Sequence, residues 1–221
     1  MLLRRLPRLP TSKCSFELER LARQSGYSAV AGVDEAGRGC LFGPVYAAAV
    51  ILDPDKPIRG LNDSKVLDAE TREALAVLIR ERAVAFAVGI ATAAEIDRIN
   101  ILQASRLAMR RAVEALAVPA DYLLIDATTV DLPLAQQAII HGDALSRSIA
   151  AASILAKTSR DARLRELDAL YPGYDLASNK GYGAPAHLAG LDRLGPTPEH
   201  RMTYAPVRDR AQPSLFAEGG L

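Results

Sequence analysis

Two apolar runs, over about 28–34 and 44–52, are joined by a short acidic and glycine-rich segment. Asp34 and Glu35 end the first run, and Gly37-Arg38-Gly39 follows them directly. Apolar runs bounded by turn residues predict β-strands. Acidic residues at a strand end beside a glycine-rich loop are typical of a site that holds a divalent cation next to a phosphate. The sequence therefore predicts a phosphate-handling site at this point of the chain.

The composition is that of a globular protein with an aliphatic core. The chain has 221 residues, 49% of them hydrophobic and 5% aromatic, which is enough to bury a core in one domain. Its net charge of +1 neither requires nor excludes nucleic acid. Cys14 and Cys40 form no disulfide framework and suit a reducing compartment. No signal peptide and no run of about 18 apolar residues is found, so we expect a cytoplasmic protein without a membrane span.

Helical and strand patterns alternate along the rest of the chain and indicate an α/β sheet covered by helices. We expect helices at about 14–24, 68–82, 97–117 and 146–170, and further strands at about 84–92, 122–125 and 138–140. Asp68 is the candidate cap of the second helix, and Ala150, Ala151 and Ala152 of the last helix permit close packing onto a sheet. We expect an N-terminal tail with a short helix over 1–27, a catalytic domain over 28–170, a helical appendage over 171–210 and a flexible tail over 211–221.

Four carboxylates occupy similar positions, namely Asp34, Glu35, Asp126 and Asp143, since each follows an apolar run. Any one of them has an ordinary explanation: Asp126 as a turn residue, or Asp143 as the cap of the helix near Ser146. Adjacent strand residues point to opposite faces, so Asp34 and Glu35 can share a site only if the strand ends or distorts there. Taken together, the four acids favour metal ligation, because buried charges need compensation.

The ligand types narrow the choice of metal and of substrate. Oxygen-only ligands favour Mg²⁺ or Mn²⁺ over zinc. Gly37-Arg38-Gly39 alone is an ordinary turn, but its place directly after two acids favours a role in binding a sugar or phosphate. Its glycines let backbone amides approach a sugar or phosphate, and Arg38 adds a charged donor.

These residues resemble a known family, the type 2 ribonucleases H, and within it bacterial ribonuclease HII. The matching stretches are 31–39, 60–65, 124–126, 141–143, 148–157 with Arg160-Asp161, 180–183 and 195–201. They occur in the family's order and together cover about residues 28–208.

The resemblance implies a ribonuclease H-like α/β fold, with a mixed central β-sheet flanked by helices and a C-terminal helical subdomain. It implies an endoribonuclease of ribonucleotide excision repair. Such an enzyme cleaves the RNA strand of RNA–DNA hybrids and incises 5′ of single ribonucleotides in duplex DNA. Two Mg²⁺ or Mn²⁺ ions would hydrolyse the phosphodiester to 5′-phosphate and 3′-hydroxyl ends.

The resemblance also assigns roles to individual residues. Asp34, Glu35, Asp126 and Asp143 correspond to the catalytic metal ligands. Gly37, Arg38 and Gly39 would read the ribose 2′-hydroxyl, the group that distinguishes RNA from DNA. Tyr182 would stack on the neighbouring deoxyribose, and Lys65 would contact a phosphate or be a surface lysine without a specific role.

The chain departs from the family's usual pattern at several positions near these motifs. Cys40 replaces a usual proline, which suggests a looser loop, and Lys65-Val66 replaces Lys-Lys. Ala127-Thr128 stands where Gly-Asn is frequent. His141 stands where lysine is common, either as a proton carrier or as a solvent-facing histidine. None of these changes affects the four acids.

Two other functions fit the residues less well. Ribonuclease H-like exonucleases also use four acids, but the first two are usually separated by one residue, whereas Asp34 and Glu35 are adjacent. A binding protein with a decayed site would not keep all four acids.

The C-terminal tail carries one short motif. Gln212, Leu215 and Phe216 resemble the peptides that bind the bacterial sliding clamp, although an inert tail is equally compatible with so short a motif. We expect a monomer.

Overall fold

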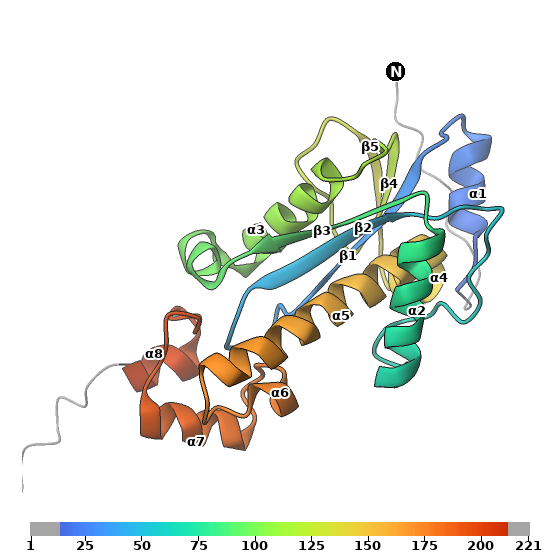
Figure 1. Cartoon of the computed structure of the whole chain (residues 1–221). Helices are drawn as coiled ribbons and strands as arrows, with labels where there is room; N and C mark the ends of the chain where they lie inside the picture. Colours follow the sequence, from blue (N-terminus) through green and yellow to red (C-terminus); the bar gives the residue numbers. More distant parts are fainter. Residues whose placement is uncertain (1–13, 212–221) are drawn as a thin grey trace, which may run out of the picture.

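The computed structural model describes residues 14–211, which form a five-stranded sheet covered by helices (Figure 1). The strands are β1 (Val30–Ala36), β2 (Val45–Ile51), β3 (Ala85–Ala91), β4 (Tyr122–Asp126) and β5 (Ala135–Ile139). Their order is β3-β2-β1-β4-β5, antiparallel from β3 to β1 and parallel from β1 to β5. The expected mixed sheet flanked by helices is confirmed.

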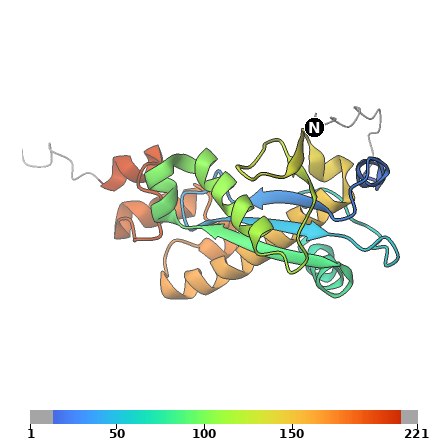
Figure 2. The ribbon, with the colours of Figure 1, turned by 90° about the horizontal axis from the view of Figure 1, so that it is seen from above.

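Helices cover both faces of this sheet, as Figure 2 shows. One face packs against α3 (Ala93–Glu114), and the other against α5 (Arg147–Leu170) and α2 (Ala69–Arg82). All seven residues of β2 are buried, because this strand is covered on both faces. The expected close packing of the alanine-rich helix is also confirmed, since Ala150, Ala151 and Ala152 are fully buried. A Cβ at Gly32 of β1 would lie 2.0 Å from the carbonyl carbon of Ser148 in α5.

The helix boundaries follow their capping residues. Asp68 caps α2 as predicted, since its carboxylate accepts a hydrogen bond from the Thr71 amide. The helix predicted over 97–117 instead runs from Ala93 to Glu114, because Thr92 and Glu95 form a capping box that sets its start. Its path is interrupted at Asn100, which has a positive φ of 66°.

The prediction was wrong around Asp143. The strand predicted over 138–140 is β5, which ends at Ile139, and Asp143 lies instead on a one-turn helix, α4 (Gly142–Leu145). Ser146 is the cap of α5, since its hydroxyl accepts from the Ile149 amide. Asp143 is therefore neither at a strand end nor the cap of the long helix.

Helices at the two ends of the chain complete the structure. The N-terminal helix α1 (Glu17–Gln24) lies within its predicted range. After α5 the chain forms α6 (Leu176–Asn179), α7 (Pro185–Leu194) and α8 (Ala205–Ala211), which share a separate hydrophobic cluster with Phe42. Figure 1 shows this appendage at the end of α5 far from α1. No helix within residues 14–211 has both the length and the apolar character that crossing a membrane requires.

Candidate active site

Asp34 and Asp126 lie on adjacent parallel strands at the centre of the sheet. Val33 of β1 pairs with Ile125 of β4, so the two aspartates follow at neighbouring positions. Because Val33 and Ile125 pack toward α3, both aspartates lie on the opposite face, the one that α5 covers. The Ser153 hydroxyl of α5 hydrogen-bonds to the Asp34 carboxylate, which is almost fully buried.

Asp143 joins them through the short helix α4. The Gly142 amide donates a 2.7 Å hydrogen bond to Oδ1 of Asp126, which fixes the start of α4 against the end of β4. The Asp143 side chain is buried, and Nζ of Lys65 lies 3.4 Å from its Oδ2. The structure therefore brings Asp126 and Asp143 together although α4 was not predicted.

Glu35 reaches this cluster in a different way from the one predicted. β1 neither ends nor distorts at Glu35, because the strand continues to Ala36, which pairs with Tyr46. By the alternation of the strand, Glu35 points to the face opposite Asp34. However, β4 ends at Asp126, so β1 extends beyond its neighbour, and the charges of Asp126 and Lys65 act on the Glu35 carboxylate. Arg38 Nη1 lies 3.3 Å from its Oε1.

The pKa values of three carboxylates in the cluster are raised, so neighbouring cations do not fully compensate their negative charges. Burial raises the pKa of Asp34 well above its usual value, and the charges of Glu35 and Asp126 raise it further. Burial also raises the pKa of Glu35 and of Asp126, with the Asp143 charge adding to the latter. A divalent cation relieves this repulsion, and carboxylate oxygens are its preferred ligands.

The four acids therefore fit a divalent cation by their chemistry and charge. Within residues 14–211, no group of three or more His, Cys, Asp or Glu side chains has the spacing that would hold a metal ion. The assignment of a divalent cation to this site therefore rests on two properties of the four acids: all their donor atoms are carboxylate oxygens, and their negative charges repel one another.

The loop after β1 is fixed by two buried arginines. Gly37 has a φ of +97°, and a Cβ there would lie 2.1 Å from Nε of Arg160, so only glycine fits. The Arg201 guanidinium donates to the carbonyl oxygens of Gly37 (2.7 Å) and Arg38 (2.8 Å). The hydroxyl of Tyr204 also donates to the Arg38 carbonyl, at 2.8 Å. In the described part of the chain, no backbone carbonyl accepts from the amides of Gly37, Arg38 or Gly39.

Tyr182 lies beside this loop. A Cβ at Gly39 would lie 3.7 Å from Cε1 of Tyr182, whose side chain is 49% exposed. The Leu41 amide donates to the Gly181 carbonyl at 2.8 Å, which ties the two segments together. Cys40 is fully buried next to Tyr182, and its thiol, together with burial, raises the pKa of the Tyr182 hydroxyl.

Lys65 stands at the rim of the carboxylate cluster on the loop before α2. Burial opposes its charge, but Asp143, Asp63 and Asp34 together raise the pKa of Lys65. Arg72 holds the loop by donating to the carbonyl oxygens of Ser64 (3.0 Å) and Leu67 (2.9 Å).

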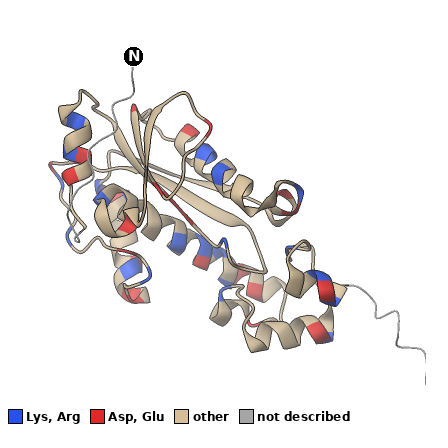
Figure 3. Ribbon diagram, turned by 180° about the vertical axis from the view of Figure 1, so that it is seen from behind, with Lys and Arg blue, Asp and Glu red and all other residues tan. Residues whose placement is uncertain are grey.

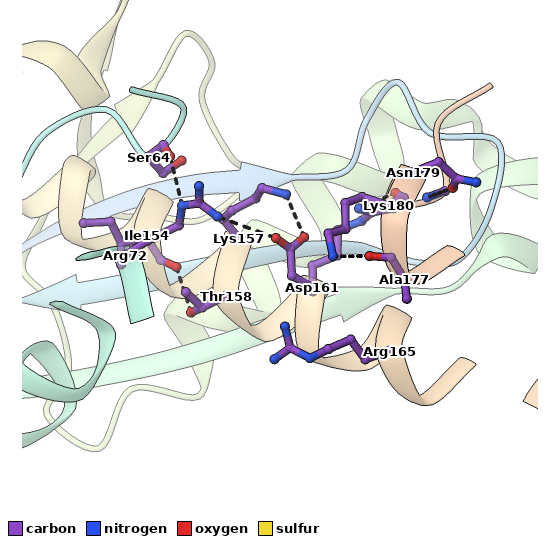
Figure 4. Close-up of polar contacts among 12 residues, drawn as sticks. Ser64, Arg72, Ile154, Lys157, Thr158, Asp161, Arg165, Ala177, Asn179 and Lys180 are labelled. Atoms are coloured by element: carbon purple, nitrogen blue, oxygen red, sulfur yellow. Dashed lines mark hydrogen bonds and ion pairs between the residues drawn. The ribbon is translucent and has the colours of Figure 1, made fainter. Parts of the chain in front are cut away.

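Arg72 in turn is linked to α5, as Figure 4 shows. Its Nη1 lies 3.7 Å from Oδ2 of the buried Asp161, whose Oδ1 accepts a 2.7 Å hydrogen bond from Lys157. The loop that carries Lys65 is therefore anchored to the helix under the site.

Sequence reasoning missed the supporting residues of the site. Arg160 and Arg201 lay within matching stretches, but no role was predicted for them, and neither was one predicted for Arg72. The available signal was a charged residue inside an apolar helical pattern, as at Arg160 in α5. His141 takes a left-handed conformation before α4, with a φ of 55° and no capping hydrogen bond from its side chain.

Comparison with known proteins decides the family. A family model described as Ribonuclease HII matches residues 31–207. The chain belongs to the ribonuclease HII family. A ribonuclease HII of Koribacter versatilis (strain Ellin345) is 57% identical over 216 residues, which are 98% of this chain and 84% of that protein. One from Laribacter hongkongensis (strain HLHK9) is 58% identical over 182 residues, 81% of this chain and 92% of that protein.

Solved structures agree with the fold. The ribonuclease H2 of Pyrococcus horikoshii OT3 is 26% identical with a TM-score of 0.70, over 83% of this chain and 97% of that one. The ribonuclease HII in the PCNA:RNase HII complex from Archaeoglobus fulgidus is 24% identical with a TM-score of 0.69, over 84% and 98%. As a ribonuclease HII, this chain is a ribonuclease H, a metal-dependent hydrolase that cleaves RNA in RNA–DNA hybrids.

Proposed function

We propose that this ribonuclease HII cleaves the RNA strand of hybrids and also incises 5′ of single ribonucleotides in duplex DNA. The products would carry 5′-phosphate and 3′-hydroxyl ends. The observation that carries the proposal is the position of the buried carboxylates beside a rigid loop with free amides and an exposed tyrosine. This combination supplies a metal site and a ribose reader on one surface.

The metal site consists of Asp34, Glu35, Asp126 and Asp143, which would hold two Mg²⁺ or Mn²⁺ ions. Its support is the all-oxygen donor set and the raised pKa values of Asp34, Glu35 and Asp126, which come first from burial and then from the charges of neighbouring carboxylates. When bound, the two cations supply an activated water and neutralise charge on the leaving oxygen. The four carboxylates would hold the ions and set their positions.

The substrate contacts come from the loop and the appendage. The amides of Gly37 and Gly39, with the Arg38 side chain, would bind the 2′-hydroxyl, which is both a donor and an acceptor. Tyr182 would stack on the following deoxyribose, and Lys65 would pair with a backbone phosphate. α5 carries further cations (Figure 3). Its C-terminal half includes the half-buried Arg163 and the exposed Arg165, which form ion pairs with Glu166 and Glu73.

Incision of a duplex that contains one ribonucleotide tests the proposal. The protein is compared with Asp34→Asn in Mg²⁺ and in Mn²⁺, with an all-DNA duplex as the substrate control. Asp55→Asn, at an exposed turn, is the matched protein control. We expect cleavage 5′ of the ribonucleotide by the protein and by Asp55→Asn only. Equal cleavage by Asp34→Asn would contradict the assignment.

We also propose that the tail binds the bacterial sliding clamp and so brings a monomeric enzyme to cytoplasmic ribonucleotide excision repair. Gln212, Leu215 and Phe216 lie outside the described residues, directly after α8. The related A. fulgidus enzyme was solved in complex with PCNA, which supports a partner of this kind. Removal of residues 212–221 should abolish clamp binding in surface plasmon resonance and leave incision of free duplex unchanged. Clamp binding that survives this truncation would rule out the tail as the docking segment.

A further inference from the structure

Two histidines face each other in the interior of the appendage. His187 of α7 and His200 both have 0% exposed surface, and their Nε2 atoms lie 3.1 Å apart. The rings of Phe42 and Tyr174 pack around them, with Phe42 edge-on to His200 at 4.7 Å between ring centroids. Neither histidine belongs to the carboxylate cluster or to the loop after β1.

The partners of this pair fix the position of every proton. Nδ1 of His187 lies 2.8 Å from the Tyr182 carbonyl oxygen, which only accepts, so this nitrogen carries hydrogen. Nδ1 of His200 lies 2.9 Å from the Thr197 amide, which only donates, so this nitrogen is bare. The neutral tautomers that follow are Nδ1–H at His187 and Nε2–H at His200. Nε2–H of His200 can then donate to the bare Nε2 of His187, so each contact has one donor and one acceptor.

Both imidazoles are neutral at ordinary pH. Burial lowers the pKa of His187 below its usual value. Burial, with a smaller contribution from His187, lowers the pKa of His200 to about 4. The hydrogen-bond chain therefore runs in one direction, from the Thr197 amide through His200 and His187 to the Tyr182 carbonyl.

The end of this chain is the backbone of the residue proposed to stack on substrate. The backbone amide of Tyr182 donates to the Asn179 carbonyl at 3.0 Å. The side-chain amide of Asn179 in turn donates to the Tyr174 carbonyl at 2.7 Å. The carbonyl oxygen of Tyr182 accepts from His187 and from the Ala184 amide, both at 2.8 Å. The histidine contact joins this turn to the side of α7 and, through His200, to the segment around His200.

We propose that His187 and His200 are positioning residues that hold Tyr182 beside Gly39 through a directional chain of hydrogen bonds. The inference rests on the proposed substrate contact of Tyr182. Stacking depends on the placement of the ring, so a turn released from α7 presents the ring to substrate less often. The histidines act on substrate binding and leave the carboxylates undisturbed.

The tautomers provide a test that needs no activity. Long-range ¹H–¹⁵N spectra of the labelled protein at pH 7.5 should show Nδ1–H at His187 and Nε2–H at His200. His187→Asn and His200→Gln assign the signals. The same tautomer at both residues, or a charged ring at either, would overturn the proposal even if the enzyme acts on another substrate.

Kinetics separate positioning from simple packing. His187→Phe keeps an aromatic ring and removes both nitrogens; we expect KM for a single-ribonucleotide duplex to rise about fivefold, with kcat within about twofold. His187→Asn, which restores a donor at the Nδ1 position, should recover most of the loss. Tyr174→Phe is the matched control, since it loses a 2.6 Å hydrogen bond to the Gly195 carbonyl in the same cluster but no contact with Tyr182.

Fluorotyrosine labelling reports the ring itself. In ¹⁹F spectra without substrate, the Tyr182 signal, identified by Tyr182→Phe, should broaden or shift in His187→Phe and stay unchanged in Tyr174→Phe. A folded His187→Phe with an unchanged Tyr182 signal and KM would refute the positioning role. Failure of the wild-type protein to incise any ribonucleotide would instead count against the proposed function alone.

Discussion

Arg201 donates a 2.7 Å hydrogen bond to the carbonyl oxygen of Gly37, a residue 164 positions earlier in the chain. The same guanidinium donates to the carbonyl oxygens of Arg38 and Gly43, at 2.8 and 3.0 Å. Arg201 is fully buried, so its charge is compensated chiefly by these carbonyl dipoles. The loop that would read the ribose is thus held in shape by the appendage.

Arg201→Lys should therefore uncouple the loop from the appendage. The single ammonium of lysine cannot donate to all three carbonyl oxygens that the planar guanidinium of Arg201 reaches. At least one buried carbonyl therefore loses its hydrogen-bond partner. We expect a loss of about 3 kcal/mol in the free energy of unfolding, measured by urea denaturation, and a fall of about tenfold in kcat/KM. Arg208→Lys, on the exposed surface of α8, is the control. Wild-type activity in Arg201→Lys would show that the loop keeps its shape without the fork.

The parts predicted from sequence are those fixed by local pattern. β1 and β2 were recognised because apolar runs end at turn residues, and Asp34 and Asp126 because each follows such a run. The start of α2 was predicted from Asp68, a capping residue whose partner lies three positions away. In each case the deciding interaction joins residues that lie only a few positions apart in the sequence.

The parts that were missed depend on contacts between distant segments. The short helix that carries Asp143 is fixed by the bond from Gly142 to Asp126, which no periodicity encodes. Glu35 reaches the cluster because β4 is shorter than β1, a property of strand pairing and not of the residues at that point. Arg160 could not be interpreted from sequence, because its role depends on Gly37 lying against it.

Asp34→Asn should abolish incision and at the same time stabilise the metal-free protein. Burial first, and then the charges of Glu35 and Asp126, hold the pKa of Asp34 above its unfolded value. The ionised carboxylate therefore opposes folding near neutral pH, and the amide removes this cost. We expect a higher urea midpoint for Asp34→Asn at pH 7.5 in EDTA. The difference should shrink as pH falls, since the wild-type carboxyl then takes up its proton.

Addition of Mn²⁺ should reverse this order. A cation that binds only the folded state stabilises the wild type more than the variant. Asp55→Asn should follow the wild type in both conditions. A metal-free Asp34→Asn that is less stable than the wild type at neutral pH would mean that the Asp34 charge is already compensated by the protein.

Acid should weaken the fold through His200. Its folded pKa of about 4 lies below its unfolded value of about 6.5, chiefly because of burial, so the unfolded chain binds a proton that the folded chain does not. The stability from neutral His200 is complete above about pH 6.5 and is lost as pH falls toward 4, by up to about 3 kcal/mol. Urea denaturation from pH 7.5 to 4.5, for the wild type and His200→Gln, isolates this contribution. The two curves should converge in acid; a constant gap between them would disprove the link to His200.

Glu19 should be one of the most sensitive positions outside the active site. Its carboxylate is 1% exposed, and Oε1 accepts from the hydroxyls of Ser146 (2.7 Å) and Ser148 (2.6 Å) and from the Ser148 amide (2.8 Å). These donors lie at the N-terminus of α5, where the helix dipole also favours a negative charge. Backbone hydrogen bonds strengthen this contact on both sides of Ser146, since the Ser15 amide donates to the Leu145 carbonyl and the Ser15 carbonyl accepts from the Arg147 amide.

Glu19→Ala leaves three buried donors without an acceptor, so we expect a loss of about 3 kcal/mol in the free energy of unfolding. Because Ser146 also ends α4, the variant should bind Mn²⁺ more weakly in calorimetry, through displacement of Asp143. Glu17→Ala, on the exposed face of the same helix, should change neither quantity, since its ion pair with Arg20 lies in solvent. If Glu19→Ala loses stability but binds Mn²⁺ as the wild type does, then α1 supports the fold without positioning Asp143.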